Sequence, residues 1–94
     1  MKDTFSETQM NLANYANLSW LEANTLTRYT VQRSATKTVV YLRYVANEDN
    51  EHWLVEVGDN VDAALTLLDV SITDRMKALK REVKRRKTKE AHYA

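Results

Sequence analysis

Few side chains in this sequence could perform catalytic chemistry. The 94-residue chain holds two histidines, His52 and His92, no cysteine and a single glycine. Without cysteine there is no thiolate nucleophile or zinc finger, and one glycine cannot build a Gly-rich phosphate loop. His52 and Glu56 share one face of a predicted strand, but four residues of strand separate them by roughly 13 Å, too far for one proton relay or metal ion. The sequence therefore predicts a protein that is not an enzyme and holds no cofactor or metal.

Basic side chains gather at the C-terminal end. Residues 1–74 carry five basic and eleven acidic side chains, a net charge of −6, whereas residues 75–94 carry nine basic and two acidic ones, a net charge of +7. Such a segment suits contact with several phosphates of a nucleic acid, or with an acidic protein surface. Lysine and arginine are also ordinary on a solvated helix near its C-terminus, and that second interpretation stays open. The candidate binding cations are Lys77, Lys80, Arg81, Lys84, Arg85, Arg86, Lys87 and Lys89.

Three stretches between residues 27 and 58 are rich in β-branched and aromatic residues, a composition typical of strands. The second and third of them flank the polar run Asn47–Asn50, whose Asn and Asp residues favour a tight turn. The sequence therefore predicts a three-stranded antiparallel sheet that contains the hairpin 38–46/51–58.

Side-chain alternation gives the second strand two apolar faces. The even-numbered residues from Val40 to Ala46 share one face, and the odd-numbered residues share the other. A sheet with one solvated face should alternate apolar and polar side chains, so this strand is expected to be covered on both sides, by helices or by another protein. In the third strand, Trp53 and its same-face neighbours oppose His52 and Glu56. The side chains predicted to form a protein interface are Val39, Tyr41, Arg43, Val45 and Trp53.

A helix is expected on each side of the strands. Ser6 and Gln9 have the spacing of a capping box, and apolar residues then recur at helical intervals, which predicts an N-terminal helix over residues 7–24. Gly58 is expected to supply an unusual backbone angle at the end of the hairpin. Asp59 or Asn60 is expected to cap the helix that follows.

The C-terminal helix is predicted from about residue 60 to residue 88, because apolar residues recur there at intervals of three and four. Ser71 and its β-branched neighbours weaken the middle, so a kink or break is expected near Ser71. At 1.5 Å per residue this helix would be about 43 Å long, more than the diameter of about 30 Å of a compact chain of this size. Residues 84–94 are therefore expected to project as a basic helical extension. The apolar stripe consists of Val61, Leu65, Leu68, Ile72, Met76, Leu79 and Val83.

The whole chain, residues 1–94, is predicted to form one small α+β domain in the order helix, three strands, helix. This order resembles that of the double-stranded-RNA-binding domain. That family begins its last helix with lysines that grip phosphate, whereas the matching turn here holds Asp59, Asn60 and Asp62. The similarity is confined to the order of the elements, and it implies no RNA-binding residue in this chain.

Two hypotheses about function follow. The first is a non-enzymatic regulatory protein, adaptor or inhibitor that binds another protein, with an architecture similar to that of small accessory proteins of phages or mobile elements. The second is a protein that binds DNA or RNA through the basic helix 75–89. Both hypotheses suit the cytoplasm and not a membrane, because the chain has no cysteine and no apolar run near the ~20 residues of a membrane span.

Self-association is also expected, with a dimer favoured. A chain of this size buries only about 60 to 65 % of the surface of its unfolded form, so its stability gains from a second copy. The apolar stripe Val61–Val83 and the exposed sheet face are alternative interfaces. In a further alternative, the acidic region Glu48–Asp62 of one protomer neutralises the basic end of another.

Overall fold

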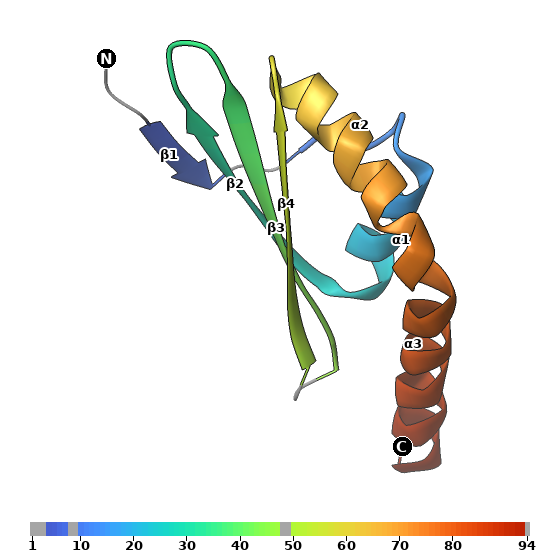
Figure 1. Ribbon diagram of the computed structural model, residues 1–94. Coiled ribbons are helices and arrows are strands. Elements are labelled where there is room, and N and C mark those ends of the chain that lie inside the picture. The colour runs from blue at the N-terminus through green and yellow to red at the C-terminus, as the bar shows by residue number, and fades with distance from the viewer. Residues whose placement is uncertain (1–3, 8–9, 48–49, 94) are drawn as a thin grey trace.

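The computed structural model describes the backbone of residues 4–7, 10–47 and 50–93 and the side chains of residues 10–46 and 50–88. Within these residues, the four strands form one antiparallel sheet in chain order, and the three helices lie on one of its faces (Figure 1). The α+β class, the predicted strands and the hairpin are therefore confirmed. The elements are β1 (Thr4–Glu7), α1 (Ala16–Asn24), β2 (Leu26–Arg33), β3 (Thr38–Asn47), β4 (Asn50–Gly58), α2 (Val61–Ser71) and α3 (Thr73–Tyr93).

The N-terminal helix is shorter than predicted. It begins at Ala16, whereas Ser6 of the expected capping box lies in β1 and Gln9 falls outside the described residues. β1 pairs with β2 from Thr4 opposite Arg33 to Glu7 opposite Thr30. The prediction that the helix starts at residue 7 is wrong because ladder hydrogen bonds to β2 satisfy this backbone instead, and the asparagines that follow favour helix only weakly.

The first turn of α1 is capped by a residue that is distant in sequence. Tyr15, at the N-cap position, makes no side-chain cap. Asp69 of α2 takes that role, because its Oδ1 accepts hydrogen bonds from the backbone N–H groups of Asn17 at 3.0 Å and Leu18 at 3.1 Å. These two N–H groups are among those that a helix start leaves without an internal partner. Packing against α2 therefore determines where α1 begins.

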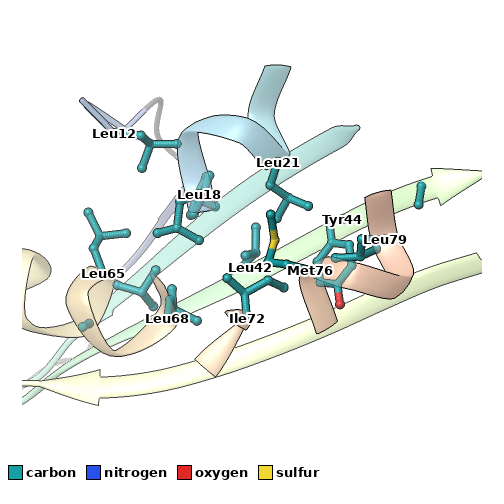
Figure 2. Close-up of a cluster of buried hydrophobic side chains, with 14 of the residues drawn as sticks. Leu12, Leu18, Leu21, Leu42, Tyr44, Leu65, Leu68, Ile72, Met76 and Leu79 are labelled. Atoms are coloured by element: carbon teal, nitrogen blue, oxygen red, sulfur yellow. The ribbon is translucent and has the colours of Figure 1, made fainter. Parts of the chain in front are cut away.

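The core lies between the inner face of the sheet and the three helices (Figure 2). The predicted alternation of β3 is confirmed, because each even-numbered side chain from Val40 to Ala46 is at most 1 % exposed. The apolar stripe of the C-terminal helices packs onto this face and is buried from Leu65 to Val83. Further core side chains come from α1 and β2, and these are Leu18, Leu21, Tyr29 and Val31.

The C-terminal helix breaks at Ile72, as expected near Ser71. The Ser71 hydroxyl donates to Glu56 Oε2 of β4 at 2.8 Å, and the Thr73 hydroxyl donates to the carbonyl of Asp69 at 3.2 Å. Ile72 itself is fully buried. Because the break is confined to one residue, the buried stripe continues from α2 into α3.

Gly58 serves a different purpose from the one predicted. Its backbone angle is not in the positive-φ region, so the expectation of an unusual angle is wrong. A Cβ atom at this position would lie 2.6 Å from the backbone nitrogen of Ala64 and 2.8 Å from Ala63 Cβ. Glycine is needed here because the end of β4 lies directly against the first turn of α2. Asn60 caps that turn as predicted, since its side chain accepts from the N–H of Ala63 at 2.8 Å.

The molecule is elongated, with extents of 53 × 21 × 19 Å and a Cα radius of gyration of 14.7 Å. A compact chain of this length would have a radius of gyration of about 12 Å. The 21 residues of α3 cause the difference, and the helix runs beyond the tip of the β3–β4 hairpin (Figure 1). Residues 84–93 of the predicted extension continue α3 as helix, and Arg86 and Lys87 within it contact Asn24 at the end of α1.

One buried hydroxyl has no hydrogen-bond partner among the described residues. Tyr29 is 4 % exposed, and its hydroxyl oxygen contacts no donor or acceptor in that part of the chain. Burial first, and then the charges of Glu22 and Asp69, raise the pKa of this phenol well above its usual range. A buried hydroxyl without a partner costs stability.

Tyr29→Phe is therefore expected to increase the free energy of unfolding by about 1 kcal/mol in urea titrations at neutral pH. An unfolded tyrosine ionises near pH 10, whereas folded Tyr29 keeps its proton. The native state of the wild type thus binds more protons above about pH 10, and stability falls as the pH rises further. The phenylalanine variant should lose less stability over that range. A variant less stable than the wild type at neutral pH would show that the hydroxyl makes a favourable contact.

Candidate interaction surfaces

The face of the sheet opposite the helices is the first candidate surface, and we call it the open face. It carries the odd-numbered side chains of β3 and β4, and the register sets Val39 opposite Val57, Tyr41 opposite Val55 and Arg43 opposite Trp53. The structure therefore brings all five side chains of the predicted protein interface onto one surface. The open face consists of Val39, Tyr41, Arg43, Val45, Glu51, Trp53, Val55 and Val57.

The strand at the edge of this face exposes large apolar side chains. Trp53, Val55 and Val57 of β4 are 52, 46 and 47 % exposed. On β3, Val39, Tyr41 and Val45 are half-buried by their neighbours. No helix of the described chain covers this face, so the expectation that β3 is covered on both sides is met on one side only. The other side is left exposed by the described chain.

Polar contacts fix one end of the open face. The Arg43 guanidinium lies 2.8 Å from Glu51, and Trp53 Nε1 donates to the same carboxylate at 2.8 Å. The hydrogen bond from Arg43, followed by the one from Trp53, lowers the pKa of Glu51. The ionised carboxylate of Glu51 therefore contacts both the guanidinium of Arg43 and the indole of Trp53.

The orientation of β4 reverses the usual apolar-inside rule. Its more polar side, with His52 and Glu56, faces the helices, whereas Trp53, Val55 and Val57 face outwards. His52 stacks on Tyr44 with ring centroids 5.1 Å apart, and Glu56 accepts from Ser71. The register with β3 requires this arrangement, because the fully buried side chains of β3 determine which side is inner.

The basic face of α3 is the second candidate surface. Lys77, Arg81, Lys84 and Arg85 are exposed and follow the helical spacing i, i+4, i+7, i+8, so they lie together on the side away from the buried stripe. Within the described part of the chain, none of these four side chains makes an ion pair or a hydrogen bond. We call these four residues the cationic stripe. Its charge is not neutralised by the described carboxylates.

The other predicted cations are placed differently. Lys80 Nζ lies 5.6 Å from the ring centroid of Trp20, and Lys87 Nζ donates to Asn24 Oδ1 at 3.0 Å. Arg86 is half-buried, and its guanidinium donates to the carbonyls of Ala46 and Asn24, each at 3.0 Å. The side chain of Lys89 lies outside those that the structure describes. Arg86 and Lys87 therefore contact the protein's own α1 and β3, and their binding to a partner stays a prediction.

The alternative that the stripe Val61–Val83 forms a dimer interface is wrong. From Leu65 to Val83 its members are at most 7 % exposed and pack against the protein's own sheet. In the other alternative, the acidic region Glu48–Asp62 neutralises the basic end of a second protomer. Part of this region already has a partner within the chain, because Asp59 forms an ion pair with Lys37 at 2.8 Å. Glu48 and Asp49 of that region lie outside the described residues.

The predicted protein interface omits three members of the open face, Glu51, Val55 and Val57. They share the alternation of Trp53, so the same argument that selected Trp53 would have selected them. Sequence reasoning also missed the exposed apolar residues Leu67 and Val70 of α2, which are 44 and 66 % exposed. Leu67 and Val70 do not fall at the intervals of three and four residues that define the apolar stripe, so the spacing argument did not select them.

Neither a metal site nor a membrane span is evident in the described part of the chain. There, no group of three or more His, Cys, Asp or Glu side chains is placed to hold a metal ion. None of the helices within the described ranges is both long and apolar enough to cross a bilayer. Comparison of the chain with protein-family models, curated proteins and solved structures finds no match.

Proposed function

We propose that this chain is a non-enzymatic regulatory protein, adaptor or inhibitor, and that its open face binds another protein. The observation that supports this most is the half-exposed trio Trp53, Val55 and Val57, on a sheet whose core is complete without it. Apolar side chains gathered on a monomer surface mark sites of association. We extend the proposal to the cytoplasm, because a chain without cysteine suits a reducing compartment.

The composition and rigidity of the open face suit a protein partner. Tryptophan, tyrosine and arginine are the residue types that contribute most to protein interfaces, and this face carries Trp53, Tyr41 and Arg43. All three are on paired strands, and the contacts of Glu51 orient two of them. Little conformational freedom is left to lose on binding, which favours affinity.

Capture from a cell lysate with matched variants tests this proposal. Val39→Lys places a charge in the open face, one strand away from the sheet edge, and is expected to reduce capture of the bound protein at least about tenfold, equivalent to 1.4 kcal/mol. The control is Val70→Lys, which adds the same charge to an exposed apolar position of α2 on the helical side. Equal capture by the wild type and both variants would contradict the proposal.

Nucleic-acid binding by the cationic stripe is the second candidate function. It is supported by the lack of ion pairs at Lys77, Arg81, Lys84 and Arg85 within the described chain. If the stripe contacts about four phosphates, the logarithm of affinity should fall against the logarithm of salt concentration with a slope near −3.6. A gel-shift titration with duplex and single-stranded DNA and RNA at low salt tests this, with R85E as the variant. Binding to none of them would exclude this function, and nuclease treatment of the lysate separates it from the first.

A further inference from the structure

β4 is an unprotected edge strand. The strand order places it at one end of the sheet, and no other described strand pairs with its outer side. It is nine residues long and contains neither proline nor lysine, whereas β1 at the opposite edge has four residues. Edge strands usually carry proline, lysine, other charges or a bulge, or are short, because a long apolar edge pairs with another strand. β4 is long and has neither proline nor lysine; its acidic side chains are Glu51 and Glu56, and the one irregularity of its ladder with β3 lies at the Asn50 end of the strand.

Apolar surface flanks this edge on the helical side as well. α2 packs on β4, and Ser71 of α2 reaches Glu56 of β4. Leu67 precedes Ser71 by one helical turn, so it lies on the same side of α2, and it is 44 % exposed. The residues that face α1 from α2, Asp62 and Asp69, are on the opposite side. Exposed apolar side chains therefore border the β4 edge in both layers.

We propose that β4 pairs antiparallel with β4 of a second copy of this chain, so that the two sheets join into one. A two-fold axis perpendicular to the sheet places the open faces of both copies on the same side of the joined sheet. Each residue of β4 then lies opposite a residue of the second copy whose side chain points to the same face. With the axis at Leu54, the midpoint of β4, every residue of the strand from Asn50 to Gly58 has a partner. This register gives the longest possible pairing.

The side chains are complementary in this register. Trp53 lies opposite Val55 of the second copy on the open side, and His52 lies opposite Glu56 of the second copy on the helical side. The carboxylate of Glu56 thus lies opposite an imidazole, which can donate a hydrogen bond to it, and not opposite another acidic side chain. Moving the axis to Val55 would set Glu51 opposite Asp59, and moving it to Glu56 would set that carboxylate opposite its own copy. Charge therefore disfavours registers shifted towards Gly58, and the length of the pairing favours the register centred on Leu54 over those shifted towards Asn50.

Cysteine cross-linking tests the pairing, because the natural chain has no cysteine. Trp53→Cys and Val55→Cys are made in separate chains, at positions exposed enough to leave the fold intact, which circular dichroism checks. Across an antiparallel pair the two Cβ atoms lie about 5 Å apart, whereas two copies of the same position lie roughly 8 Å apart. Under mild oxidation, the mixture of both chains is expected to form at least about fivefold more disulfide dimer than either chain alone.

A second pair of positions checks the register. Glu51→Cys mixed with Val57→Cys should also cross-link efficiently, whereas Glu51→Cys mixed with Val55→Cys should not, because those positions are offset by two residues. Equal cross-linking in both mixtures would overturn the proposed register. Cross-links only to a different, captured protein would show that a foreign strand occupies the edge and would overturn the self-pairing.

Sedimentation velocity tests the assembly without any substitution. The wild type is expected to have an apparent mass of twice the 10.9 kDa of the monomer. The Val55→Lys variant, which carries a lysine on the edge strand, is expected to have the mass of the monomer. A monomer at every concentration tested would overturn the proposal. Val39→Lys should remain dimeric because Val39 lies on β3. A variant that stays dimeric but captures less protein from the lysate therefore tests the open-face proposal. A wild type that does not dimerise would overturn only the proposed pairing of β4.

Discussion

Arg86→Ala is expected to lower the free energy of unfolding by about 3 kcal/mol. The half-buried guanidinium donates to the carbonyl of Ala46, at an irregularity in the β3–β4 register, and to the carbonyl of Asn24, at the end of α1. Neither carbonyl belongs to a regular ladder, and a positive charge at a helix C-terminus is stabilising. Alanine would leave both carbonyls without this donor and would remove one of the links that join α3 to α1 and to the hairpin.

The neighbouring residue provides a matched control. Arg85 carries the same charge one position earlier but is exposed and makes no ion pair or hydrogen bond with the described residues. Arg85→Ala should change the free energy of unfolding by less than about 0.5 kcal/mol. Urea unfolding followed by circular dichroism measures both variants. Equal effects of the two substitutions would contradict the role assigned to Arg86.

Gly58→Ala is expected to destabilise the protein by about 3 kcal/mol, at the upper end of the range for overpacking. The new Cβ would lie 2.6 Å from the backbone nitrogen of Ala64, which cannot move without displacing the start of α2. The same N–H bonds to the carbonyl of Asn60 at 3.2 Å, so displacement would also disturb the first turn of the helix.

Val57→Ala is the control for this prediction. It changes the adjacent residue of β4, but its side chain is 47 % exposed on the open face and should cost less than about 1 kcal/mol. Thermal or urea unfolding compares the two variants. If Gly58→Ala were as stable as the wild type, the close approach of β4 and α2 would be wrong.

Local sequence patterns were sufficient to predict the hairpin and the C-terminal helices. Alternation in β3 and the spacing of the apolar stripe both depend on neighbouring residues, and both are confirmed by burial. The start of α1 could not be predicted in this way. It depends on β1 pairing with β2 and on Asp69, which is more than 50 residues away from the N–H groups that it caps.

The sequence predicted which side chains share the open face, but it could not predict whether that face is exposed. The sequence pattern places Val39, Tyr41, Arg43, Val45 and Trp53 on exposed-side positions, but whether a face is covered is a property of the whole fold. For Arg86 a signal was present. It follows Leu79 by seven residues and Val83 by three, so it shares the phase of the buried stripe, which distinguishes it from Arg85.

Hydroxyl-radical footprinting of the complex captured from a nuclease-treated lysate tests the central claim, that the open face is the binding surface. At a protein concentration that keeps the assembly state constant, the account predicts that Trp53 and Tyr41 become protected when the partner is bound, while Trp20 and Leu67 on the helical side react as before. Protection confined to α3, with Trp53 as reactive as in the uncomplexed protein, would contradict it.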